Sequence, residues 1–232
     1  MPDRVLTRYR YVKEYDTRTN VKESLIYACL QNAWKITPSK NNFMPYRVQV
    51  IGPKRRDLKT KVYNLCISNE RKFDDPNITI EEFYKKRYTD KNSFPQYHNI
   101  MSAPYIFVFS QRHAENLNPW QQNSRDEGRT YEQMHKDNPA IFFKTSALEI
   151  GMFANNLARE CLANGLDISH TLCTPTAREF WEEEEFPLNP NDHRVMLVMT
   201  AGKASYYRED VIKGTLEAED LKPAFEDIVQ IL

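Results

Sequence analysis

The chain has 232 residues, of which 41% are hydrophobic, and its 32 lysines and arginines balance its 32 aspartates and glutamates. A chain of this length can bury a full core, so we predict a single domain over residues 1–232, and zero net charge gives no field that would attract nucleic acid or an anionic membrane. No run approaches the roughly 18 apolar residues of a membrane-spanning helix, and residues 1–4 lack an apolar secretory start, so we expect a soluble, cytoplasmic protein.

The first elements are a helix, a loop and a strand. Apolar residues recur at helical spacing over residues 21–33, where Asn20 can cap the start and Pro38 ends the run. A short apolar strand follows at residues 48–51. The Pro-bounded residues between them, 38–46, are too polar for a core, so this loop presents Ser and Asn side chains from an anchored turn. Such a turn suits recognition of a flat polar ligand.

The middle of the chain alternates between apolar and polar stretches. Residues 105–109 and 195–199 are apolar enough to be central strands. Two long polar excursions, at about 57–102 and 111–140, flank the first of them. The earlier excursion has helical character from residue 57 onward. The later one has no sustained period and is either a lid or dimer-wrapping insertion, or a plain surface loop.

The second half begins with the clearest helix, at residues 147–164, whose C-terminal stop is Gly165. A turn into a short strand that reaches Cys173 follows, and Thr174 with Pro175 is predicted to start another helix. The acidic residues 182–185 of that helix are predicted to be a solvated face. Strands separated by helices predict an α+β or α/β layered sandwich.

The spacing of cysteine, histidine and glycine excludes several kinds of site. The four cysteines form no Cys-x-x-Cys pair and the five histidines are scattered, so we predict buried free thiols and no metal site. The six glycines are isolated, so the sequence contains neither the Gly-rich motif of a dinucleotide-binding turn nor that of a P-loop. Any bound phosphate must therefore be held by Arg and Lys.

The loop pattern Pro-Ser-x-x-Asn-x-x-Pro at residues 38–45 resembles the FMN-dependent nitroreductase family, where Pro-Ser-x-x-Asn-x-Gln-Pro faces the flavin ring. The basic segment 8–16 is similar to the family's opening, and residues 149–166 are similar to its central helix. The strand that ends at Gly202 and the tail 221–229 resemble its last core strand and its C-terminal tail. The resemblance implies an α+β fold: a nitroreductase-like three-layer sandwich with a central mixed, mainly antiparallel sheet flanked by helices, in a domain-swapped-arm homodimer.

The resemblance also implies a set of FMN-binding residues. Cations of the basic segment and the tail would hold the phosphate and the O2 edge of the ring, the loop would face the ring, and main-chain N–H groups after the central helix would approach the flavin N5. A fixed ammonium near the reduced ring would raise the flavin's reduction potential. Cys173 is read as a small strand residue and not as a nucleophile. The set comprises Arg8, Arg10, Lys13, Pro38, Ser39, Asn42, Leu172, Cys173 and Lys222.

The activity implied by the resemblance is ping-pong reduction of a nitroaromatic or quinone, with NADH or NADPH as donor and two FMN sites at the interface of a homodimer. Met44 replaces the family's usual Gln, which leaves the acceptor open. A reductive dehalogenase resembling iodotyrosine deiodinase is an alternative, since residues 80–87 loosely resemble that group's lid, although Ile80 occupies its Glu position. A catalytically silent binding protein with the same fold is a second alternative, motivated by Tyr11 and Met44.

Overall fold

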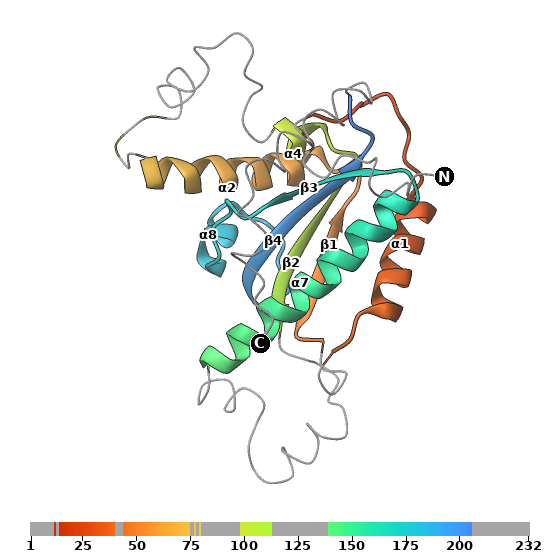
Figure 1. The fold of residues 1–232 in the computed structure, drawn as a ribbon. Coiled ribbons are helices and arrows are strands. Elements are labelled where there is room, and N and C mark those ends of the chain that lie inside the picture. The colour runs from red at the N-terminus through yellow and green to blue at the C-terminus, as the bar shows by residue number, and fades with distance from the viewer. Residues whose placement is uncertain are drawn as a thin grey trace, which may run out of the picture.

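The computed structural model describes residues 12, 14–39, 44–74, 77, 79, 98–112 and 139–205. A sheet lies between two layers of helices, with α1 and α7 on one face and α2, α4 and α8 on the other (Figure 1). The helices are α1 (Glu23–Ile36), α2 (Arg56–Asp74), α4 (His98–Ser102), α7 (Pro139–Ala163) and α8 (Arg178–Glu183), and the strands are β1 (Tyr46–Ile51), β2 (Tyr105–Arg112), β3 (Asp167–Thr171) and β4 (Asp192–Gly202).

The sheet has the strand order β1-β2-β4-β3, so the two most apolar runs of the sequence form its central pair, as predicted. Every strand pairing among the described residues is antiparallel. The predicted α+β layered fold is confirmed, but no parallel strand that would make the sheet mixed occurs in this part of the chain. The tail that would form a swapped arm lies outside the described residues.

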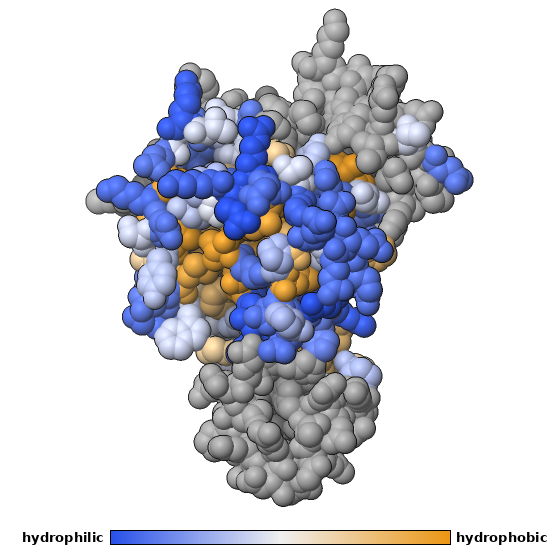
Figure 2. All heavy atoms as spheres, turned by 180° about the vertical axis from the view of Figure 1, so that it is seen from behind, coloured by the Kyte–Doolittle hydropathy of each residue, from blue (hydrophilic) through white to orange (hydrophobic). Residues whose placement is uncertain are grey.

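The central strands pack apolar side chains on both faces of the sheet. In β2, Tyr105, Phe107 and Phe109 face the core beneath α1 and α7, whereas Ile106 and Val108 face the core beneath α2 and α8. Successive residues of a strand point to opposite faces, so a strand with two buried faces reads as an unbroken apolar run. Figure 2 shows the face opposite α7, where hydrophilic side chains surround a central group of apolar ones.

The helix ends differ from the predictions in three places. The cap residue of α1 is Lys22 and makes no side-chain cap hydrogen bond, so the predicted Asn20 cap is wrong. The N-cap of α8 is Ala177 and not Thr174, which is buried. α7 begins at Pro139, well before the predicted residue 147. The prediction missed this start because the first turns show no stripe of buried residues at helical spacing. Its predicted stop is confirmed, since Gly165 has a φ of 77°.

The predicted excursions are partly regular structure. α4 and all of α2 except its first residue lie within residues 57–102, and β2 and α7 border the second excursion. The rest of both excursions lies outside the described residues. Among the described helices, none combines the length and the apolar character needed to cross a membrane.

Lys59 of α2 is a cation buried beneath the sheet. The residue is 5% exposed, and its Nζ donates to the carbonyl oxygens of Ala103 and Pro104. No carboxylate in the described part of the chain forms an ion pair with it. Desolvation of the ammonium lowers the pKa of Lys59 from 10.5 to about 8.

The buried ammonium gives the protein a specific dependence of stability on pH. Because the pKa of Lys59 is lower in the folded chain than in the unfolded chain, the unfolded chain binds more protons between those two values, and stability rises with pH across that window. We expect the free energy of unfolding of wild type to rise relative to Lys59→Met by about 3 kcal/mol between about pH 7 and pH 10.5. Urea titrations of both proteins at several pH values measure this difference. Parallel pH profiles would contradict the assignment.

Candidate functional site

The end of α1 is held rigidly against α7. The backbone N–H and the hydroxyl of Thr37 both donate to the carbonyl of Ala33, at 3.0 and 2.6 Å. Nδ2 of Asn156, on α7, donates to Thr37 Oγ1 at 2.9 Å. Pro38 follows directly, so the predicted ligand loop leaves the helix from a fixed position.

The loop is closed by a contact between its two ends. Ser39 Oγ accepts a hydrogen bond from the backbone N–H of Met44 at 2.7 Å, and Met44 has a φ of 44°. A serine hydroxyl that accepts in this way still has its own proton to donate to a ligand. Asn42, between these ends, lies outside the described residues.

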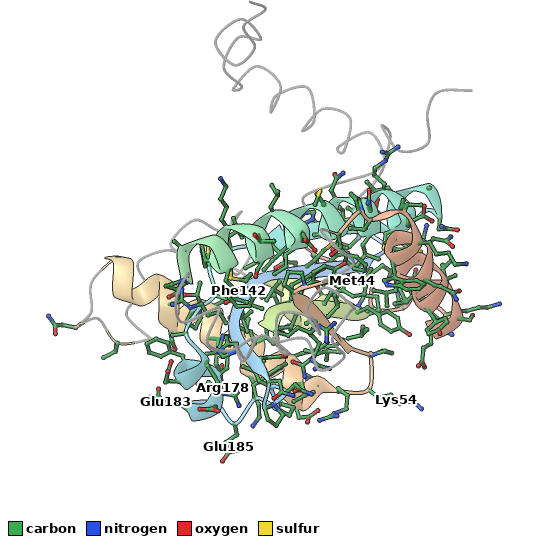
Figure 3. All side chains as sticks on the ribbon, turned by 90° about the horizontal axis from the view of Figure 1, so that it is seen from below. Met44, Lys54, Phe142, Arg178, Glu183 and Glu185 are labelled. Atoms are coloured by element: carbon green, nitrogen blue, oxygen red, sulfur yellow. The ribbon has the colours of Figure 1, made fainter. Side chains whose placement is uncertain are left out.

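Two further residues, Arg112 and Trp34, support the loop, and sequence reasoning missed them. Nε of Arg112 donates to the carbonyls of Met44 and Tyr46, at 3.1 and 2.8 Å. Nε1 of Trp34 lies 3.2 Å from the sulfur of Met44, which Figure 3 shows beneath α7 and toward α1. Arg112 comes from β2, far away in sequence, so no local pattern could have indicated its role.

The loop is followed by Tyr46, a buried tyrosine whose hydroxyl is influenced by the buried carboxylate of Glu149. The Tyr46 ring packs on Phe153 with centroids 5.2 Å apart, and its hydroxyl has no hydrogen-bond partner in the described part of the chain. Burial raises the pKa of Tyr46, and the charge of Glu149 raises it further, while Arg112 opposes both. Tyr46 therefore stays neutral at physiological pH.

The second group of predicted residues lies just after β3. Leu172 is 74% exposed and Cys173 is exposed, and neither backbone N–H has a hydrogen-bond partner among the described residues. The interpretation of Cys173 as a strand residue is wrong, because the pairing of β3 with β4 ends at Thr171. Two adjacent exposed N–H groups beside an edge strand can donate to a ligand. The prediction of buried free thiols is confirmed for Cys29, Cys66 and Cys161 and is wrong for Cys173, which is exposed.

The two groups of predicted residues lie next to the two edge strands of the sheet. Ser39 precedes β1 and Leu172 follows β3, and these strands are the opposite edges of the sheet. Three interstrand spacings separate the edges, which is about 14 Å.

The basic N-terminal segment is anchored beside β3. The backbone N–H of Val12 donates to the Ile168 carbonyl at 3.3 Å. Tyr15 is buried, its Oη lies 2.8 Å from Thr200 Oγ1, and its backbone N–H donates to Ser102 Oγ at 3.0 Å. These contacts bring the described part of the segment to the same edge of the sheet as the N–H groups after β3.

Several predicted cofactor residues are not described, so their contacts stay predictions. They are Arg8, Arg10, Lys13, Asn42 and Lys222. Within the described ranges, no group of three His, Cys, Asp or Glu side chains is placed to hold a metal ion.

An FMN molecule fits the residues that are described. Its isoalloxazine ring is flat and polar at one edge, and the exposed N–H groups after β3 are donors of the kind that its ring nitrogen accepts. The anchored Pro38–Ser39 loop of a second copy would supply a further surface. The described residues offer the Ser39 hydroxyl and the backbone N–H groups of Leu172 and Cys173 for binding and orienting a ligand.

Comparison with known proteins identifies the family and the fold. The chain matches the Nitroreductase family over residues 6–203. Its structure is similar to a nitroreductase-like protein of Streptococcus mutans, with 17% identity, a TM-score of 0.62 and coverage of 98% of this chain and 96% of the other. It is also similar to an Exiguobacterium sibiricum protein assigned as a nitroreductase, in complex with FMN, with 14% identity, a TM-score of 0.61 and coverage of 98% and 95%.

A third similar structure is a Staphylococcus epidermidis protein assigned as an NAD(P)H:FMN oxidoreductase, with 13% identity, a TM-score of 0.62 and coverage of 100% of this chain and 97% of the other. No protein with a curated description matches the chain in sequence. At these identities the structures support the fold, while the family match spans most of the chain. The protein belongs to the nitroreductase family.

Proposed function

We propose that the protein is an FMN-dependent oxidoreductase that uses NADH or NADPH to reduce an electron-poor acceptor, such as a nitroaromatic or a quinone, by a ping-pong mechanism. The observation that carries the proposal is the pair of backbone N–H groups of the exposed residues Leu172 and Cys173, which have no hydrogen-bond partners in the described part of the chain. The family match and the FMN bound by one similar structure support the choice of cofactor.

Residues of the chain would bind and orient the flavin, and hydride transfer from the nicotinamide to the acceptor is the chemistry that FMN would supply when bound. The N–H groups of Leu172 and Cys173 would donate to the ring. Arg8, Arg10, Lys13 and Lys222 would hold the phosphate and the O2 edge. In a partly desolvated site their positive charge would stabilise negative charge on the ring.

A homodimer would complete the site with Pro38, Ser39 and Asn42 of the second copy. Seven large apolar side chains are exposed in the described part of the chain, and five of them lie on α1 and α7. Those five are Tyr27, Trp34, Ile36, Phe143 and Leu148. An apolar surface on the helices that anchor the loop is what a symmetric interface between copies requires.

The visible absorption spectrum of the purified protein, before and after anaerobic addition of NADH or NADPH, tests the proposal. A flavin spectrum that bleaches, and that returns when a quinone or nitroarene is added, is the expected result. Turnover of a halotyrosine without reduction of nitroarenes would instead favour the dehalogenase alternative, whose segment 80–87 lies outside the described residues. A colourless protein that takes up no added FMN would contradict the proposal and favour the alternative of a catalytically silent binding protein.

A further inference from the structure

A cavity of about 470 Å³ lies where α2 begins. Its walls come from the residues that precede α1, the turn after β1, the first turns of α2 and the connection from α4 to β2. None of the described residues assigned to the flavin lines it. The volume is in the range of pockets that take small molecules.

The charged side chains that line this cavity are three cations and one carboxylate: Arg18, Arg56, Lys59 and Asp16. Asp16 is already satisfied, because its carboxylate accepts from the backbone N–H and Nε of Arg18, at 3.0 and 3.2 Å, and from the hydroxyl of Thr19 at 2.9 Å. These hydrogen bonds lower the pKa of Asp16, so it stays ionised and paired. The remaining two cations, Arg56 and Lys59, face the cavity without a carboxylate partner among the described residues.

Lys59 is the deepest of these groups. Two of the three ammonium N–H donors are accounted for by the Ala103 and Pro104 carbonyls. A buried cation without a counter-charge is costly, and an anion in the cavity would supply that charge. Arg56, four-fifths of a turn away as the first residue of α2, adds a second donor group, and the positive end of the helix dipole lies at the same place.

We propose that this cavity binds a small molecule through a phosphate group, at a site separate from the flavin. A phosphate carries close to two negative charges near neutral pH and several acceptor oxygens, which matches one guanidinium and one ammonium at the start of a helix. The cavity has room for more than the phosphate itself, and Thr17 and Asn20 in its wall offer hydrogen bonds to the remainder of the ligand.

Titration with inorganic phosphate tests the proposal in the full chain with FMN bound, which keeps the flavin's own phosphate site filled. Isothermal calorimetry is compared with chloride at equal ionic strength, and the thermal midpoint is recorded in parallel. We expect saturable phosphate binding to wild type. Arg56→Gln should weaken it about tenfold, the effect of losing one charged hydrogen bond. Arg55→Gln is the matched control, because Arg55 pairs with Asp57 and does not line the cavity.

A second variant, Lys59→Met, is expected to abolish saturable binding, provided that its thermal unfolding remains cooperative. Release of FMN is followed by flavin fluorescence in every titration. Phosphate that displaces FMN would assign the effect to the flavin site and overturn the proposal. So would binding no stronger than that of chloride, or equal losses in the Arg55 and Arg56 variants. If the purified protein holds no FMN, the same titrations apply to it directly, so failure of the flavin assignment and failure of this site are told apart.

Discussion

Replacing Leu148 with glutamate is expected to convert the proposed dimer to a monomer and to abolish retention of FMN. Leu148 is 63% exposed at the middle of α7, among the apolar side chains that would meet the second copy. In a symmetric interface each of the two subunits contributes one new carboxylate, and burial of an unpaired charge costs several kcal/mol. FMN should then be lost, because in the proposed dimer the loop and the N–H groups of one site would come from different copies.

Size-exclusion chromatography with light scattering reports the oligomeric state, and the ratio of flavin to protein absorbance reports the cofactor. Thr60→Glu is the matched control, since Thr60 is exposed on α2, on the other face of the sheet. The control should stay dimeric and yellow. If the Leu148→Glu protein remains dimeric, α7 is not part of the interface. A monomer that retains FMN would contradict a site shared between copies.

Gly202→Ala should lower the free energy of unfolding by about 2–3 kcal/mol, the cost of forcing an extra methyl into a well-packed core. Gly202 ends β4, and a Cβ there would lie 2.6 Å from Pro104 Cδ and 2.7 Å from Tyr15 Cδ1. Neither neighbour can give way, because Pro104 is a closed ring and the Tyr15 side chain is fully buried between the sheet and α4.

Urea unfolding measured beside a matched glycine variant checks this prediction. At Gly52 an added Cβ would meet a carbon of the Tyr105 ring at 3.7 Å, which is an ordinary contact. Gly52→Ala should therefore change stability by no more than about 0.5 kcal/mol. Equal stabilities of the two variants would mean that the chain relaxes around residue 202.

The fold was predictable where local pattern and burial agree. β2 and β4 are apolar on both faces, so their central position could be read from composition alone, and Gly165 marks the end of α7 because a left-handed residue is needed there. The starts of α7 and α8 were missed because local pattern and burial do not agree there. Phe143 in the first turns of α7 is exposed, so no buried stripe shows that the helix has begun.

The candidate site was predictable only in part. The loop at Pro38 and the turn at Leu172 could be found as motifs, yet their placement at opposite edges of the sheet follows from the strand order and not from spacing. Arg112 and Trp34 support the loop through contacts that tertiary structure alone creates. The cavity at α2 was missed entirely, because its cations come from separate segments and form no run in the sequence.

The left-handed backbone conformation of Met44 affects the rate and the entropy of ligand binding at the loop. A non-glycine residue in the left-handed region costs about 1 kcal/mol or more, and Ser39, Trp34 and Arg112 hold Met44 there through their contacts. The end of the loop is thus ordered by the protein itself. A ligand that docks against it loses little affinity to freezing of the chain, so its association should be fast and its binding entropy less unfavourable than for a loop that orders on contact.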